Sequence, residues 1–142
     1  MKSLFALPLL ALLPVLFLSA CNQSSDSEIV AILQQNAQAA QSENLAAYMN
    51  TYHSQSPLRQ SDKAKMPGVF SSYNLKYSIS DVEVESSTDE EIQARYTLLT
   101  QKTDNTGPPF RNNKTVQHVV FKKENGQWKI YEARIMKIEY VE

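Results

Sequence analysis

Residues 116–138 read VQHVVFKKENGQWKIYEARIMKI, and this stretch decides the fold. Two runs rich in β-branched and aromatic residues flank Glu124, Asn125 and Gly126. An Asn-Gly pair between two such runs is a strong signal for a β-hairpin with a tight turn. The stretch therefore predicts a long hairpin that forms the centre of an antiparallel sheet.

Two further strands are predicted before this hairpin. Apolar and polar residues alternate at residues 75–79 and again at 92–98, which is the period of a half-buried strand. After Ser80 the apolar residues move from odd to even positions, and a strand cannot change faces in this way without an extra residue. We therefore predict a β-bulge near Ser80 and Asp81. A similar shift follows Ile130, so we expect a strongly curved sheet.

Helices are predicted for the first half of the mature chain. Apolar residues recur at spacings of three and four from about residue 27 to 41, and again in a shorter segment at 43–53. After a loop, Asp62 is a capping residue for a third, short helix. Pro67 and Gly68 are expected to end or kink that helix.

The predicted order is thus two or three helices followed by about four antiparallel strands. Helices gathered on one face of an antiparallel sheet define an α+β domain. We predict a single α+β domain at residues 28–142, with N-terminal helices packed on a strongly curved antiparallel sheet of about four strands. Such a cone-like fold leaves a conical hollow between the helices and the sheet.

The first 20 residues have the pattern of a signal peptide. Lys2 gives a basic start, and residues 4–18 are apolar and uncharged but shorter than the roughly 20 residues of a spanning helix. A small-residue exit follows, as in secreted proteins. Residues 1–20 are therefore predicted to be removed, and residues 21–27, which are polar, to form a flexible tether.

The exit sequence Leu18-Ser19-Ala20-Cys21 resembles the lipobox of bacterial lipoproteins. The resemblance implies that the Cys21 sulfur receives a diacylglyceryl group and that its new amine receives a fatty acid such as palmitate. Cys21 is the only cysteine, so it has no disulfide partner within the chain. The alternative is an ordinary signal peptide cut at Ser19-Ala20, which leaves Cys21 as a passenger.

Lipidation of Cys21 predicts a membrane-anchored protein, because two or more acyl chains hold a protein firmly on a bilayer. In Gram-negative lipoproteins an Asp after the cysteine favours the inner membrane, and this chain has Asn22 there. The resemblance therefore favours the outer membrane, with the domain facing the periplasm, over the inner membrane.

Composition excludes several function classes. The net charge is −1, and no basic run is longer than Lys122-Lys123, so we predict no binding to nucleic acid. The chain has three glycines and no Gly-rich phosphate loop, so we expect no cofactor. His53 and His118 lie far apart without a nearby set of metal-ligand residues, so we expect no metal.

The order of elements resembles the nuclear-transport-factor-2-like superfamily, also called cystatin-like α+β. The GxWKI turn at residues 126–130 and the short helix ending in Tyr-His-Ser at 52–54 carry most of the resemblance, which covers nearly all of residues 27–138. Pro67-Gly68 departs from the uninterrupted third helix of that superfamily. The superfamily contains ketosteroid isomerase, scytalone dehydratase and polyketide cyclases, but also domains without known chemistry, so the fold does not give the function.

The candidate pocket residues are four tyrosines and one histidine. They are Tyr48, Tyr52, Tyr77, Tyr96 and His118. Buried tyrosine hydroxyls can stabilise an oxyanion, but ketosteroid isomerase chemistry also needs two acidic residues in apolar surroundings. No inward-facing position of the predicted strands carries one, so we predict no catalytic residue. If it faced the hollow, the histidine would be a candidate general base.

His118 and a group of acidic residues are both predicted to lie on the solvent-exposed face of the sheet. Alternation groups His118 with lysines, which indicates the outer face of the sheet. The acidic residues Asp81, Glu83 and Glu85 also alternate with valines, and we interpret them as an outer face paired across to Arg95.

The leading functional prediction is a non-catalytic envelope lipoprotein domain that binds a partner protein or a small apolar ligand. The first alternative is a pocket enzyme of the isomerase or dehydratase type. The second is an accessory of an envelope assembly that associates with itself, for example as a homodimer.

Overall fold

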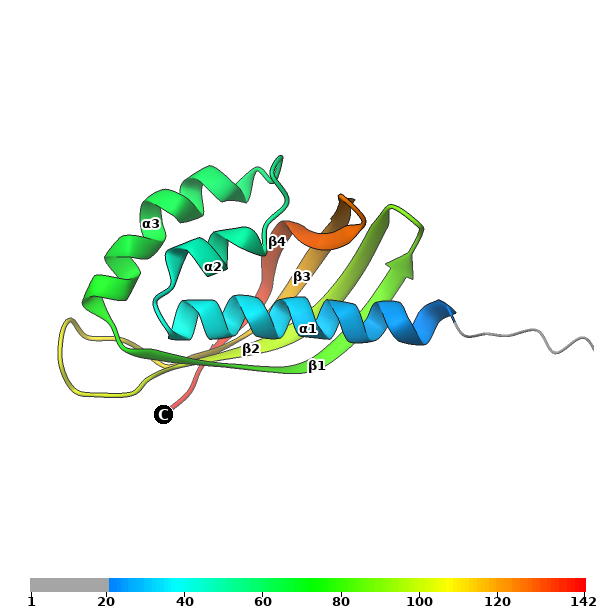
Figure 1. The fold of residues 1–142 in the computed structure, drawn as a ribbon. Helices are drawn as coiled ribbons and strands as arrows, with labels where there is room; N and C mark the ends of the chain where they lie inside the picture. The colour runs from blue at the N-terminus through cyan, green and yellow to red at the C-terminus, as the bar shows by residue number, and fades with distance from the viewer. Residues whose placement is uncertain (1–20) are drawn as a thin grey trace, which may run out of the picture.

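The computed structural model describes residues 21–142. Its helices are α1 (Cys21–Gln41), α2 (Leu45–Asn50) and α3 (Leu58–Ser72), and its strands are β1 (Leu75–Ser87), β2 (Glu91–Lys102), β3 (Asn113–Glu124) and β4 (Gln127–Tyr140). The strands form one antiparallel sheet in the order β1-β2-β3-β4, and the helices lie together on one side of it (Figure 1). The predicted α+β class with a four-stranded curved sheet is confirmed.

The β3–β4 hairpin turns at the predicted residues. Asn125 and Gly126 have φ angles of 52° and 76°, and Glu124 pairs with Gln127 across the turn. Positive φ at both central residues is the backbone of a type I′ turn, which Asn and Gly adopt at little cost. The turn residues therefore fix the register from which the rest of the hairpin follows.

Irregular pairing bends the sheet where the sequence changes its alternation. The β1–β2 register shifts between Ser80 and Glu83, and Asp81 has a φ of 52°, which confirms the predicted bulge. In β4, Tyr131 is skipped in the pairing with β3, and Met136 is skipped further along. Each extra residue bends its strand and increases its twist, so the sheet curves around the helices.

Helix α1 begins earlier than the sequence predicted. Residues 21–27, predicted as a flexible tether, form its first turns. The predicted signal peptide at residues 1–20 and the side chain of Cys21 lie outside the described residues, so their fate stays a prediction.

Pro67 and Gly68 were expected to end or kink the third helix, and the structure shows that α3 does not end there. The helix continues through Pro67 and Gly68 to Ser72. A proline inside a helix removes a hydrogen bond and costs about 3 kcal/mol. Met66 on the same helix is buried in the core and Phe70 packs against it, so tertiary packing offsets this local cost.

The hydrophobic core lies between α1 and the concave face of the sheet. Its most deeply buried side chains are Phe121, Ile29, Leu33, Ile92 and Val119. The buried hydrophobic residues all lie between Ile29 and Ile130, so a chain starting at residue 21 contains the whole described core.

A backbone connection fixes the segment after α2 against β4. The His53 N–H donates to the Ile130 carbonyl at 2.9 Å, and the Ile130 N–H donates to the Thr51 carbonyl at 2.9 Å. Tyr52, between these residues, forms a parallel bridge with Ile130. This connection holds the Tyr52 side chain over the concave face of the sheet.

Within the described part of the chain, none of the helices combines the length and apolar character needed to cross a membrane.

Two glycines give a matched pair of predictions. Gly107 has a φ of 71°, and a Cβ there would lie 2.5 Å from the Ser72 carbonyl oxygen, whereas a Cβ on Gly68 in α3 would meet nothing within 4 Å. We expect Gly107→Ala to lower the free energy of unfolding by about 1–3 kcal/mol. We expect Gly68→Ala to raise it by roughly 0.5–1 kcal/mol, because alanine is the better helix former. Urea denaturation of both variants measures the difference, and equal effects would contradict the loop geometry.

Candidate functional site

The helices and the concave face of the sheet surround a hollow of about 330 Å³. Its apolar lining comes from α1, from α3 and from β1, β2, β3 and β4. These residues are Ala37, Ala40, Leu58, Met66, Ile79, Leu98, Val119, Ile130, Ala133 and Ile135. Sites for small molecules range from about 300 to 1,000 Å³, so this volume suits a compact ligand. The conical hollow expected from the sequence is therefore open.

A group of three hydroxyl and carboxylate side chains lies at the lining of this hollow. The Tyr52 hydroxyl donates to Oδ2 of Asp62 at 2.7 Å, and the Tyr48 hydroxyl lies 3.3 Å from the same oxygen. The two hydroxyl oxygens are 3.0 Å apart, and the two rings lie 5.5 Å apart between centroids. Residues four apart share one face of a helical segment, so α2 and its extension present both tyrosines to Asp62 on α3.

The environment of this group keeps the tyrosines protonated. Burial, above all, raises the pKa of Tyr48 and of Tyr52 far above the ordinary value, and the neighbouring Asp62 charge acts in the same direction. Both hydroxyls are therefore neutral at physiological pH. Lys65, one turn further along α3, lies 3.8 Å from Asp62 Oδ1, and its side chain is 67% exposed. Such an exposed ion pair is weak.

A second polar group lines the hollow from the sheet. The Tyr96 hydroxyl on β2 donates to Gln117 Oε1 on β3 at 3.0 Å, and Gln117 Nε2 donates to Thr115 Oγ1 at 3.1 Å. Tyr96 and Gln117 are paired across the two strands, so the ladder itself brings them together. Burial raises the pKa of Tyr96, which remains a neutral hydrogen-bond donor.

The structure brings together four of the five candidate pocket residues. Tyr48, Tyr52, Tyr77 and Tyr96 all line the hollow. His118 does not, because it alternates along β3 with residues that face the hollow. Its side chain lies on the other side of the sheet, where Nε2 is 3.6 Å from Glu85 Oε2.

The outer face around this histidine is a charged surface, as the sequence indicated. Arg95 contacts Glu83 at 2.9 Å and Glu85 at 3.5 Å. The predicted pairing of the acidic residues across to Arg95 is therefore confirmed for these two. Such exposed pairs contribute about 0–1 kcal/mol each, so they mark a solvated face rather than a site.

Asp62 is the residue that sequence reasoning missed. It was interpreted as a helix cap, but α3 begins at Leu58, so Asp62 lies inside the helix and its side chain reaches the hollow. The expectation of no inward-facing acidic residue concerned the strands alone, and Asp62 reaches the hollow from a helix. The spacing of Leu58, Asp62 and Met66 was the available signal, because residues four apart share one helix face and all three line the hollow.

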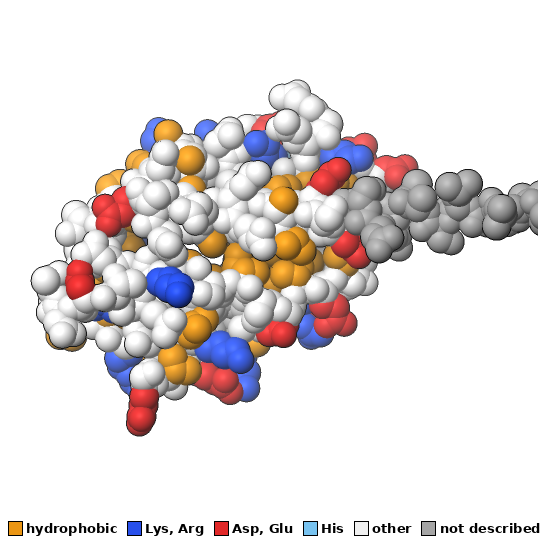
Figure 2. Space-filling view, turned by 60° about the horizontal axis from the view of Figure 1, so that its bottom comes forward, with side chains coloured by type: hydrophobic (Ala, Val, Ile, Leu, Met, Phe, Trp, Pro, Cys, Tyr) orange, Lys and Arg blue, Asp and Glu red, His pale blue; other side chains and the backbone are white. Residues whose placement is uncertain are grey.

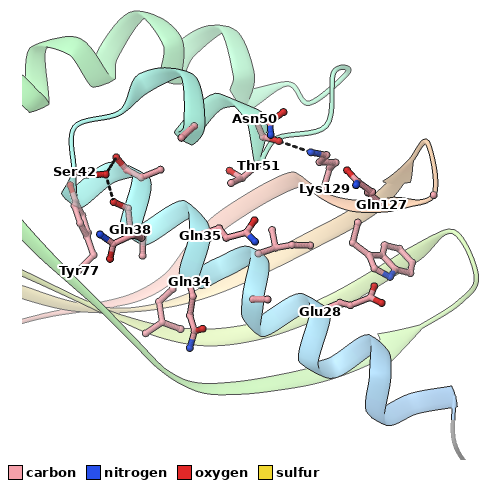
Figure 3. Close-up of a pocket in the computed structure, with 18 residues that line it drawn as sticks. Glu28, Gln34, Gln35, Gln38, Ser42, Asn50, Thr51, Tyr77, Gln127 and Lys129 are labelled. Carbon is pink, nitrogen blue, oxygen red and sulfur yellow. Dashed lines mark hydrogen bonds between the residues drawn. The ribbon is translucent and has the colours of Figure 1, made fainter.

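A second, more open groove runs beside α1 (Figure 3). It has a volume of about 1,230 Å³, and its lining mixes apolar residues with amide side chains such as Gln34, Gln35 and Gln38. Figure 3 shows its labelled polar residues spread along α1 and across to the β3–β4 turn, without convergence on one point. Lys129 at its far end donates to the Asn50 carbonyl at 2.7 Å. The hollow between the helices and the sheet, which is less open and has converging polar groups, is therefore the stronger candidate site.

The surface offers a third feature, at the end of β4. Four large apolar side chains there are about half exposed, and they are Ile135, Met136, Ile138 and Tyr140. On the face drawn in Figure 2, hydrophobic side chains gather near the middle, and acidic and basic side chains are interspersed around them.

No His, Cys, Asp and Glu residues within residues 21–142 form a group that could hold a metal ion.

Comparison with known sequences identifies one family. The family described as "Anti-sigma-I factor RsgI9, C-terminal domain" matches residues 31–141. A curated relative, anti-sigma-I factor RsgI9 of Acetivibrio thermocellus, is 25% identical over 118 residues. That alignment covers 83% of this chain but only 16% of the relative, so the chain spans a small part of that protein.

Comparison with solved structures identifies the fold. A putative scytalone dehydratase from Novosphingobium aromaticivorans matches with a TM-score of 0.68 at 13% identity, covering 85% of this chain and 90% of that one. A protein of unknown function with a cystatin-like fold from Nostoc punctiforme matches with a TM-score of 0.65 at 12% identity, covering 83% and 92%. Rv3472 (D26N) of Mycobacterium tuberculosis, also of unknown function, matches with a TM-score of 0.73 at 10% identity, covering 86% and 76%. At these identities the likeness shows the fold alone, and it confirms the expected nuclear-transport-factor-2-like, or cystatin-like, architecture.

Proposed function

The chain belongs to the family of the anti-sigma-I factor RsgI9 C-terminal domain, and from this premise and its open hollow we propose that it is a non-catalytic binding domain. The hollow holds a small, largely apolar ligand. One observation carries the proposal: a partly enclosed space of about 330 Å³ combines apolar side chains from the helices and the sheet with a fixed polar group at Asp62. Apolar surface with a few fixed polar groups is the usual composition of a small-molecule site.

The hollow is organised before any ligand arrives. Among the described residues, no buried side-chain nitrogen or oxygen lacks a hydrogen-bond partner. The tyrosine, carboxylate and amide groups hold one another in place, so a ligand does not have to order them on binding. Preorganisation of this kind lowers the entropic cost of association.

The hydrogen bonds of the tyrosines also favour binding over oxyanion chemistry. Tyr52 gives its single hydroxyl hydrogen to Asp62, and Tyr48 has only Asp62 or Tyr52 within reach. A catalytic tyrosine of the ketosteroid isomerase type needs that hydrogen for the developing oxyanion. In this hollow the hydrogen is already committed to the neighbouring carboxylate.

An enzyme of the isomerase or dehydratase type is the second candidate, and Asp62 is the observation that favours it. A carboxylate in an apolar hollow is a suitable general base. Turnover of a bound compound that is abolished by Asp62→Asn would favour this candidate. Binding without turnover would favour the non-catalytic binding domain.

Family membership supports a use of this binding in regulation through a protein partner. The relative is named as a factor that opposes a sigma factor, and the matching family describes its C-terminal domain. We propose that the domain likewise serves a regulatory protein. The apolar end of β4 at Ile135 and Ile138 is the surface that suits a partner, or a second copy of this chain in the assembly alternative.

The domain is proposed to act as an envelope lipoprotein anchored through Cys21 on the periplasmic side of the outer membrane. We expect Cys21→Ser to leave the fold unchanged and to move the protein from the membrane fraction to the soluble fraction, because the variant cannot receive the lipid. Ser25→Ala is the control and should remain with the membrane. If Cys21→Ser still sediments with membranes after a high-salt wash, the anchoring proposal is wrong.

Native mass spectrometry tests the binding proposal. The protein is purified from its own host without detergent, starting at residue 21 and carrying Cys21→Ser. Ala133→Trp fills the hollow from β4, whereas Glu132→Trp adds the same ring at the neighbouring exposed position. We expect a small-molecule adduct on the parent protein and on Glu132→Trp, and none on Ala133→Trp. An adduct on all three proteins would place the ligand elsewhere, and no adduct on any would count against the proposal.

A further inference from the structure

We propose that the ligand of the hollow carries a hydrogen-bond donor, a hydroxyl or an amine, which meets Asp62, and that a compact apolar body bears this donor. The inference rests on the proposed function, since it concerns the ligand class of the same hollow. It is carried by the arrangement of hydrogens around Asp62 together with the lining of the cavity.

The hydroxyl hydrogens of Tyr48 and Tyr52 are donated within the protein. The Tyr52 hydroxyl donates to Asp62 Oδ2 at 2.7 Å, and the Tyr48 hydroxyl lies within reach of Tyr52 and Asp62 only. A tyrosine has one hydroxyl hydrogen but two acceptor lone pairs, and an ionised carboxylate only accepts. What the group offers to a ligand is therefore acceptor capacity.

The second polar group also uses its tyrosine hydrogen within the protein. Tyr96 gives its hydrogen to Gln117 Oε1, and Gln117 in turn donates one of its two Nε2 hydrogens to Thr115. Because Gln117 keeps a second N–H, this group is a mixed donor and acceptor, and the acceptor-only group is the one at Asp62.

The negative charge of Asp62 disfavours an anionic ligand. Asp62 is 15% exposed, and its nearest cation, Lys65, lies 3.8 Å away with most of its side chain in solvent. A ligand carboxylate placed beside Asp62 would add a second negative charge where water is scarce, and like charges repel strongly there. An alcohol has no such cost, and an ammonium group gains from the carboxylate.

The side chains that line the hollow determine the size and the apolar character of the rest of the ligand. Leu58, Met66 and Ile135 line the hollow with Asp62, and the volume of about 330 Å³ leaves room for a ring of six carbons beside the polar group. The donor therefore sits on a compact hydrocarbon frame rather than on a long chain or a polyol.

Three probes with one frame test the inference: cyclohexanol, cyclohexylamine and cyclohexanecarboxylate. Each is titrated into the chain from residue 21, carrying Cys21→Ser, and followed by methyl NMR of Ile130, Ala133 and Ile135, which line the hollow. We expect the alcohol and the amine to shift these methyl signals with dissociation constants at least about tenfold below that of the carboxylate, since one charge-assisted hydrogen bond separates the probes.

The matched variants are Asp62→Asn and Glu83→Gln. Asp62→Asn should remove the preference for the amine over the carboxylate, whereas Glu83→Gln on the outer face should leave all three affinities unchanged. If Asp62→Asn does not fold, the order of the three probes on the parent protein still decides. Binding of the carboxylate as tightly as the alcohol and the amine would overturn the ligand class but leave the hollow as a binding site. Binding of none of the probes in the hollow would overturn both proposals.

Discussion

Replacing Trp128 by alanine is expected to lower the free energy of unfolding by about 3–5 kcal/mol, the range for a buried large aromatic side chain. Trp128 is only 5% exposed and belongs to the core beneath α1. It is the second residue of β4, next to the turn, and the Lys123 ammonium lies 4.9 Å from its ring centroid. Alanine would leave a cavity where the hairpin meets the helix.

Tyr140→Ala is the matched control, because it removes a large aromatic side chain from the other end of β4. Tyr140 is 54% exposed, and its described aromatic contact is with the Arg111 guanidinium at 3.7 Å. Its loss should cost roughly 0.5–1 kcal/mol, the worth of an exposed cation–π contact. Urea denaturation compares the two variants. Equal losses of free energy in the two variants would contradict the assignment of Trp128 to the core-facing side of the sheet. In a thermal melt, a shift of a degree or less for Trp128→Ala would contradict it as well.

Alkaline pH is expected to destabilise the protein steeply. The pKa values of Tyr48, Tyr52 and Tyr96 are raised in the folded state, chiefly by burial. Above the unfolded value of about 10, the unfolded chain therefore releases the protons of these three tyrosines, which the folded chain keeps. Their stabilising contribution is complete below pH 10 and declines as the pH rises. Each tyrosine reduces the free energy of unfolding by about 1.4 kcal/mol per pH unit, or roughly 4 kcal/mol for the three.

Urea denaturation at a series of pH values from neutral to strongly alkaline measures this slope. Tyr96→Phe is the informative variant, because it removes one of the three titrating hydroxyls and retains the ring. Its slope above pH 10 should be smaller by about 1.4 kcal/mol per unit, whatever its stability at neutral pH. A flat profile above pH 10 for the parent protein would show that these tyrosines are not buried in solution.

The parts of the fold that local chemistry dictates were predictable from the sequence. Asn125 and Gly126 specify a turn with two positive φ angles, so the hairpin and its register follow from two residues. The change of alternation at Ser80 required an extra residue, and the bulge lies there. Alternation along β3 also indicated that His118 belongs to the solvated face, where it contacts Glu85.

The features that depend on tertiary packing were not predictable in this way. Pro67 and Gly68 are locally unfavourable in a helix, yet α3 continues because Met66 and Phe70 pack on the core. The place of Asp62 in the hollow follows from that longer helix. Because the helix was predicted to begin at Asp62 and not at Leu58, the sequence did not reveal Asp62 as a residue of the hollow. Whether the hollow is filled or open depends on how side chains from three helices and four strands meet, which alternation does not reveal.

A crystal structure of the protein purified from its own host without detergent would show whether the hollow holds a ligand. We expect electron density for a non-protein molecule in the hollow, with a donor group within hydrogen-bond distance of Asp62 and its body against Met66 and Ile135. A hollow closed by its own side chains would rule out the binding proposal. So would a hollow empty of ligand in a dimer joined through the apolar end of β4, and the assembly alternative would then take its place.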